Sequence, residues 1–311
     1  MRYFPRTGLL ALMLVGFSWS ISGPALAGPF EDGATAYRAG DFATALEHWR
    51  PLADRGNAAA QFALGNMYDS GMGVPQDYAQ AFAWTRKAAD RGFRDAQNKV
   101  GLMYERGQGV AQDYAQAAAW YRKAAAQGDV ASQFNLGVMY DNGRGVPVDY
   151  EQALTWYRRA ADKGHAGAQT NIGILYDAGR GVPKDYVRAM EWYRKAAAQG
   201  RAKAQTNIGY LYEHGLGVPV DYVQAVEWYR LAADRGDPTG QMNLGVMYET
   251  GRGVPQDLVQ AHTRYTIALS RYPEEQKRAE ATKARDRVAA KMTPEQLADA
   301  DGLANAWQPA N

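Results

Sequence analysis

The chain has 311 residues, of which 46% are hydrophobic and 22% charged, and its formal net charge is +2. This balance lacks the basic excess expected of a surface that binds nucleic acid or an anionic membrane. The sequence contains no cysteine, which excludes disulfides, thiol catalysis, cysteine-ligated metals and a cysteine-linked lipid anchor. Its length and hydrophobic content suffice for a sizeable core, so we expect a chain stabilised by packing alone.

The first 27 residues have the pattern of a cleavable export signal. Arg2 and Arg6 form a basic start, residues 9–17 are apolar, and residues 25–27 read Ala-Leu-Ala, a small-x-small cleavage sequence. The apolar run is shorter than the about 20 residues of a membrane-spanning helix, and an uncleaved N-terminal anchor is the alternative. Cleavage after Ala27 would remove both arginines and leave a net charge of 0. We therefore expect a periplasmic or secreted protein with no membrane span after cleavage.

A repeat of 36 residues dominates the rest of the sequence. A Gly-x-Gly pair recurs six times in register, from Gly71 to Gly253, and a tyrosine stands three residues before each pair. A fixed period of this length is typical of solenoids, whose units bury their apolar faces only by stacking. Because each pair follows a helical pattern and precedes an aspartate, we interpret the pairs as turns rather than as phosphate-binding loops.

Each repeat predicts two helices. In the unit that begins at Gly145, Asp149 is placed to cap a helix that ends before Gly164, and Gln152 is placed to complete a capping box. A second helix is predicted from about residue 166 to 177, with Gly179 as its stop. The expected capping aspartates of the six units are Asp77, Asp113, Asp149, Asp185, Asp221 and Asp257.

These helix pairs predict an all-α fold, a right-handed superhelical solenoid. Alanines at the repeat period allow close approach of the helices, and we expect the large aromatic side chains to fill the gaps between pairs. The tryptophans assigned to this packing are Trp84, Trp120, Trp156, Trp192 and Trp228. A ladder of aromatic rings that stacks on carbohydrate is the alternative interpretation.

The repeated motif A-x-x-W-Y-R-[KR]-A-A-x-x-G-x-x-x-A-Q-x-x-[LI]-G-x-x-Y-x-x-G-x-G-V-P-x-D resembles the Sel-1-like repeat, a relative of the tetratricopeptide repeat. The resemblance extends over residues 37–272 and implies six repeats in residues 57–272. It leaves residues 28–56 as an N-terminal capping segment with a first helix and residues 273–311 as C-terminal capping helices. Leu297, Leu303 and Trp307 are expected to cover the end of the stack. Among the departures from the motif, Thr85 replaces a tyrosine and Lys99 replaces an asparagine.

Polar and variable columns provide the candidate binding residues. An asparagine column and its neighbouring glutamines, Gln133 among them, either satisfy buried backbone groups between repeats or face the groove as donors for a peptide. A variable column on the other helix changes from alanine to polar and acidic residues. The candidate partner-binding residues are Asn135, Asn171, Asn207 and Asn243 in the first column and Thr155, Glu191 and Glu227 in the second.

The sequence offers no catalytic set, no metal-binding spacing and no cofactor motif. We therefore expect a non-enzymatic scaffold that binds another envelope or periplasmic protein through its concave face. The resemblance implies adaptor roles in envelope assembly, motility, virulence or control of sensor kinases. Binding of peptidoglycan or another polysaccharide is the alternative. β-Lactam binding or hydrolysis, attributed to cysteine-rich relatives, is a further and weaker alternative, because this chain lacks their cysteine pairs.

Overall fold

The computed structural model describes residues 28–310, so the predicted export signal lies outside the described residues. The described chain is helical throughout and contains no strand, which confirms the predicted all-α fold. The helices are α1 (Pro29–Arg38), α2 (Phe42–Asp54), α3 (Ala58–Ser70), α4 (Tyr78–Asp90), α5 (Arg94–Arg106), α6 (Tyr114–Ala126), α7 (Val130–Asn142), α8 (Tyr150–Ala161), α9 (Ala166–Ala178), α10 (Tyr186–Ala197), α11 (Ala202–His214), α12 (Tyr222–Asp234), α13 (Pro238–Thr250), α14 (Leu258–Arg271), α15 (Glu275–Ala289) and α16 (Pro294–Ala306).

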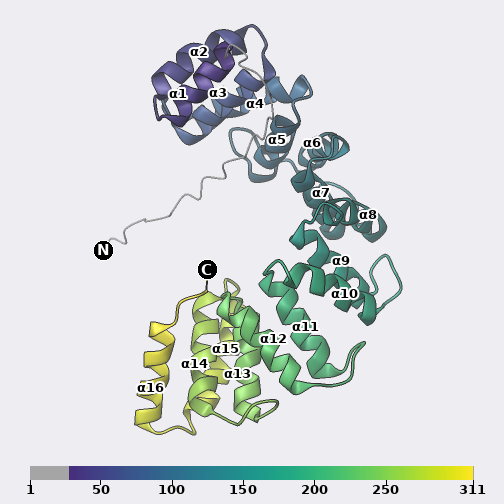
Figure 1. Ribbon diagram of the computed structural model, residues 1–311, viewed down its shortest axis with the longest axis vertical. Helices are drawn as coiled ribbons and strands as arrows, with labels where there is room; N and C mark the ends of the chain where they lie inside the picture. The colour runs from purple at the N-terminus through teal and green to yellow at the C-terminus, as the bar shows by residue number, and fades with distance from the viewer. Residues whose placement is uncertain (1–27, 311) are drawn as a thin grey trace, which may run out of the picture.

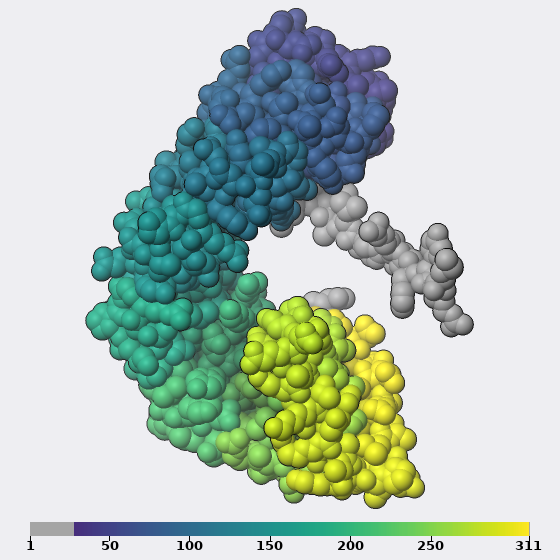
Figure 2. Space-filling view, turned by 180° about the vertical axis from the view of Figure 1, so that it is seen from behind, coloured from purple at the N-terminus to yellow at the C-terminus, as the bar shows by residue number. Residues whose placement is uncertain are grey.

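Consecutive helices pack on one another and form a curved solenoid with two layers. The chain curves around an open hollow (Figures 1 and 2), and α5 and α7 lie nearer to this hollow than α6 and α8. The helices α11 and α13, which are separated in the chain by α12, also contact each other, as expected on the shorter inner circumference. We call α3, α5, α7, α9, α11 and α13 the inner layer, and α4, α6, α8, α10, α12 and α14 the outer layer.

Each Gly-x-Gly pair forms the turn between the two helices of one repeat. Gly143 ends α7 in the left-handed conformation with φ of 67°, and Gly145 has φ of 70°. A Cβ atom on Gly145 would collide with the backbone of Tyr114, at the start of the outer helix of the preceding repeat. Both glycines are therefore required, the first by its dihedral angle and the second also by close contact between repeats.

The aspartate that follows each turn caps the outer helix. The Asp149 side chain accepts a hydrogen bond from the Gln152 backbone N–H at 2.9 Å, and the same bond occurs in each repeat. The predicted capping box is wrong, because the Asp149 backbone N–H donates to the Tyr140 carbonyl at 3.0 Å and is not free for Gln152. Within the described residues, a reciprocal capping box is present at Thr293 and Gln296, before α16.

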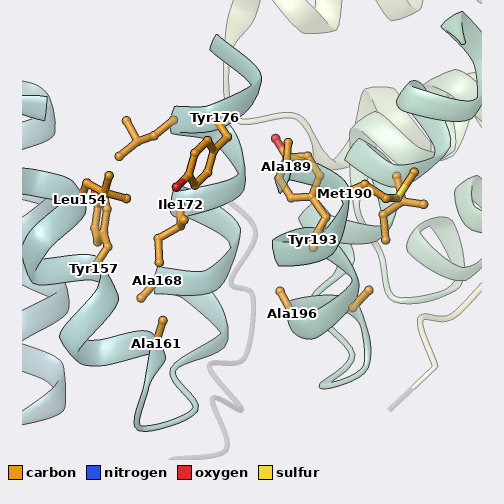
Figure 3. Packing of buried hydrophobic residues seen from close by; sticks show 14 of the residues in the cluster. Leu154, Tyr157, Ala161, Ala168, Ile172, Tyr176, Ala189, Met190, Tyr193 and Ala196 are labelled. Carbon is orange, nitrogen blue, oxygen red and sulfur yellow. The ribbon is translucent and has the colours of Figure 1, made fainter. Parts of the chain in front are cut away.

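The core lies between the layers and combines buried tyrosines with alanine and aliphatic side chains. Tyr157 of α8 and Tyr193 of α10 are fully buried, and α9 packs between them through Ala168, Ile172 and Tyr176 (Figure 3). The ring of each tyrosine lies on a glycine of the preceding inner helix, where a Cβ atom would come within 2.5–2.7 Å of it. The Leu-Gly or Ile-Gly pair of each central repeat therefore makes room for a tyrosine ring.

The tryptophans are less central to the core than the tyrosines. Trp84 and Trp120 are buried, whereas Trp156, Trp192 and Trp228 are only half-buried. Cationic side chains cover several of these rings on the outside, for example Lys123 at 3.8 Å from the Trp120 ring centroid and Lys195 at 4.1 Å from that of Trp192.

Helices α15 and α16 both pack on α14 and close the C-terminal end of the solenoid. The buried residue of α16 is Ala300, whose carbonyl accepts a hydrogen bond from the Thr263 hydroxyl at 3.2 Å. Leu303 is 46% exposed, so its predicted covering role is wrong; a small residue makes the contact because α16 approaches α14 closely. Trp307 is half-buried beneath the Arg271 guanidinium.

Candidate protein-binding surface

The inner helices expose one stripe of side chains toward the hollow. In α7 the residues that retain solvent exposure include Ala131, Phe134, Val138, Asp141 and Asn142. Their spacing of three or four residues places them on one side of the helix. The opposite side packs against the outer layer, so the stripe faces the inside of the curve.

In the five inner helices from α5 to α13, a carboxylate near the end of the helix meets the tip of a buried tyrosine from the outer layer. The Tyr121 hydroxyl donates to Glu105 at 2.6 Å, that of Tyr157 to Asp141 at 3.1 Å, and that of Tyr193 to Asp177 at 3.2 Å. Tyr229 and Tyr265 donate to Glu213 and Glu249, both at 2.7 Å. Each tyrosine thus reaches from the outer layer to a carboxylate on the inner face.

The environment of these pairs stabilises the protonated phenol. Burial raises the pKa of Tyr121, Tyr157, Tyr193, Tyr229 and Tyr265 well above the ordinary value, and the adjacent carboxylates raise it further. A tyrosine in this state is a permanent hydrogen-bond donor near neutral pH. The pairs therefore serve as fixed donor–acceptor contacts between the two layers.

The asparagine column lies beside these tyrosines. Hydrogen bonds from Asn135, Asn171, Asn207 and Asn243 lower the pKa of Tyr121, Tyr157, Tyr193 and Tyr229 in part, against the larger effect of burial. All four asparagines are half-buried. Their side chains are therefore engaged with the preceding repeat, and their role as donors to a partner stays a prediction.

The neighbouring glutamines form a ladder to backbone carbonyl groups. The Gln133 side-chain amide donates to the Ala125 carbonyl at 3.2 Å, and Gln61, Gln97, Gln169 and Gln241 make the equivalent bond eight residues back. These glutamines are at most 7% exposed. Of the two interpretations of this column, the structure supports the one in which it satisfies buried backbone groups.

Three carboxylates of the inner column are neutralised by cations of the chain itself. Lys99 Nζ lies 2.8 Å from Asp69, and Arg252 Nη2 lies 3.1 Å from Glu213. Arg287 of α15 binds Glu249 through Nε at 2.8 Å and Nη2 at 2.7 Å, the two-pronged geometry that guanidinium groups make with carboxylates. This ion pair holds the pKa of Glu249 below its ordinary value.

The variable column does not face the groove. Thr155, Glu191 and Glu227 are exposed on α8, α10 and α12, which belong to the outer layer. Their expected position on the concave face is therefore wrong, because the helical pattern alone does not show which layer follows the shorter circumference. Their participation in partner binding stays a prediction.

The sequence interpretation missed the tyrosine–carboxylate pairs, although two signals point to them. An acidic residue directly follows the repeated tyrosine of every inner helix, from Asp69 to Glu249. In addition, Thr85 and Lys99 replace a tyrosine and an asparagine in the same repeat junction. In the structure the Lys99 ammonium occupies this junction and binds Asp69 and Asn66, so that a lysine takes the place of the tyrosine hydroxyl as donor to the carboxylate.

Over residues 28–310, the structure shows no group of three or more acidic or histidine side chains arranged to hold a metal ion. No helix in this range combines the length and the apolar character needed to cross a membrane.

Comparison with known proteins agrees with this architecture. The family model described as Sel1 repeat matches residues 58–93, 94–129, 130–165, 166–200, 202–237 and 238–263. A Sel1 repeat protein from Oxalobacter formigenes is 33% identical, with 79% of this chain and 98% of that chain covered and a TM-score of 0.71. A protective antigen of uropathogenic Escherichia coli that displays an SLR fold is 30% identical, with 90% and 76% covered and a TM-score of 0.40. No match was found among curated proteins.

The fold and the inner surface thus define a repeat scaffold with a two-layered helical solenoid. The chain belongs to the Sel1-repeat family, whose repeats mediate protein–protein interaction and are typically non-catalytic. This confirms the family expected from the repeated motif.

Proposed function

We propose that the protein is an exported, periplasmic or secreted adaptor that binds another protein on the inner surface of the solenoid and catalyses no reaction. The observation that carries this proposal is the stripe of half-exposed residues that continues over the inner layer from α3 to α13. A surface of this kind, built from stacked repeats, offers a long contact area to a polypeptide partner. The predicted signal in residues 1–27 supports export.

Binding of peptidoglycan or another polysaccharide is the alternative. Half-buried tryptophans at the repeat period, such as Trp156 and Trp192, favour it in principle because sugars stack on exposed aromatic rings. However, Arg159 lies 4.3 Å from the Trp156 ring centroid and Lys195 lies 4.1 Å from that of Trp192, so each ring already has a cationic neighbour. This arrangement favours the protein-binding role.

Site-specific crosslinking in intact cells tests the proposal. A photoreactive residue at Val138, on the inner stripe, is compared with one at Arg122, which is exposed on the outer helix α6. We expect Val138 to capture a defined protein, identified by mass spectrometry, that Arg122 does not capture. Absence of a protein adduct at Val138, or binding of the purified protein to peptidoglycan in a pull-down, would contradict the adaptor role. Fractionation of the same cells tests export.

A further inference from the structure

The central part of the inner surface combines carboxylates with exposed apolar side chains. Asp141 lies on α7 and Asp177 on α9, each three residues after a half-exposed apolar residue, Val138 or Ile174. Tyr210 of α11 continues the apolar row and is 44% exposed. We call Val138, Asp141, Ile174, Asp177 and Tyr210 the central strip.

The same column of carboxylates already binds cations at both ends of the solenoid. Asp69 pairs with Lys99 near the N-terminal end, and Glu249 pairs with Arg287 of the capping helix α15 near the C-terminal end. In each case the cation comes from a helix that follows later in the chain, α5 for Asp69 and α15 for Glu249. The capped ends therefore show which chemistry these repeat positions accept.

The central carboxylates lack such a cation. Asp141 and Asp177 accept hydrogen bonds from Tyr157 and Tyr193, and within residues 28–310 no cationic side chain forms an ion pair with either. The turn residue Arg252, which pairs with Glu213, corresponds to Arg180 for Asp141 and to Leu216 for Asp177. The Arg180 guanidinium lies over the Tyr150 ring at 5.6 Å, as that of Arg252 lies over the Tyr222 ring at 5.4 Å, but it forms no ion pair with Asp141. Leu216 carries no charge.

We propose that the central strip binds a cationic polypeptide segment whose arginine or lysine side chains pair with Asp141 and Asp177 while its apolar side chains contact Val138, Ile174 and Tyr210. This inference rests on the proposed adaptor function and specifies the chemistry of the partner. The tyrosine hydroxyls hold the carboxylates in place, so a guanidinium meets oriented acceptors, as Arg287 does at Glu249. Burial raises the pKa of Asp177, and the hydrogen bond from Tyr193 and the charge of Lys184 lower it only in part.

The repeat geometry also constrains the segment. Neighbouring packed helices are about 10 Å apart, so successive carboxylates of the inner layer have about this spacing. A polyproline-type extended chain advances about 9 Å in three residues and then presents side chains in the same direction again. We therefore expect basic residues at every third position of the bound segment, separated by small apolar residues or proline.

A fluorescein-labelled peptide of about 12 residues, with arginine at every third position and proline and valine between, is the probe. Anisotropy measures its binding to the chain without its signal and to two double variants, Asp141→Asn/Asp177→Asn and the matched outer control Glu191→Gln/Glu227→Gln. Both variants remove two negative charges. We expect the inner variant to weaken binding by roughly 10- to 100-fold and the outer one by less than about 3-fold, because only the former removes charge-assisted hydrogen bonds. Circular dichroism and thermal denaturation check that both variants are folded.

A peptide with glutamine in place of each arginine should bind at least about 10-fold more weakly than the arginine peptide. Equal loss in the inner and outer variants would show unspecific charge attraction and overturn the proposal, as would undetectable binding to the unmodified chain. If either result overturns the peptide proposal while Val138 still captures a protein in cells, the adaptor function remains supported. Loss of capture at Val138 would instead reject the adaptor function itself.

Discussion

The first repeat junction and the central ones solve the same packing problem in different ways. In the centre, a buried tyrosine such as Tyr157 fills the space between the layers and donates to a carboxylate on the inner face. In the first junction, Thr85 leaves this place unfilled and Lys99 enters it from α5, where it binds Asp69. The carboxylate is thus matched in both regions, by a neutral donor in one and by a cation in the other. Only the central junctions, in which the donor is a neutral tyrosine, leave a negative charge to offer to a partner.

The largest expected effect comes from introducing the threonine of the first junction into a central repeat without the lysine that accompanies it. Tyr157→Thr removes a fully buried ring and leaves a cavity against Gly137. We expect a loss of about 3–5 kcal/mol in the free energy of unfolding, as for other large-to-small changes of aromatic core residues. Trp156→Ala at the neighbouring half-buried position is the control and should cost clearly less. Urea denaturation measures both, and an equal or larger loss for Trp156→Ala would contradict the assignment of the tyrosines as the main core aromatics.

Completing the exchange should recover part of this loss. Asn171 corresponds to Lys99, so Asn171→Lys in the Tyr157→Thr background provides an ammonium group for Asp141. We expect a favourable coupling of about 1–3 kcal/mol in a double-mutant cycle, because the added charge satisfies a carboxylate that lost its donor. Additive effects of the two substitutions would show that Thr85 and Lys99 do not compensate each other.

The reverse test concerns Lys99 itself. Lys99→Met keeps most of the side-chain volume but leaves Asp69 and Asn66 without their shared donor. The Lys99 side chain is 18% exposed and that of Asp69 is 32% exposed, so solvent replaces the lost contact in part. We expect a loss of about 1 kcal/mol. Lys203→Met, at an exposed position of α11, is the matched control, and a loss of the same size there would remove the special role of Lys99.

Much of this fold is predictable from the sequence because its determinants are local. Gly143, Gly145 and Asp149 fix the turn and the cap by dihedral preference and short-range hydrogen bonds, and their period reveals the stacking. The candidate surface depends on the curvature of the whole stack, which no single repeat encodes. The helical pattern therefore predicts Thr155 in the groove, although it lies on the outer layer.

The capping box shows a related limit of the sequence interpretation. Its geometry at Asp149 depends on whether the backbone N–H is free, and a carbonyl of the preceding helix already binds that group. The tyrosine–carboxylate pairs join the two helices of a repeat, so the pairing becomes evident only when both layers are placed.

The smallest expected effect separates the paired and unpaired carboxylates by their response to pH. The Arg287 ion pair lowers the pKa of Glu249, so this group stabilises the fold above its unfolded pKa and loses that contribution as the pH falls through the folded value. Burial raises the pKa of Asp177, so its contribution has the opposite sign: it is fully present below the unfolded pKa and is lost as the pH rises through the folded value.

Acidification from about pH 7 to about pH 4, close to the ordinary carboxyl pKa, covers this range. Glu249→Gln should reduce the acid-induced loss of stability, and Asp177→Asn should increase it, because the latter removes a contribution that grows on acidification. The change in urea midpoint between the two pH values, compared among both variants and the unmodified chain, measures the effect. A shift in the same direction for both variants would mean that the centre and the C-terminal end hold their carboxylates in equivalent electrostatic surroundings.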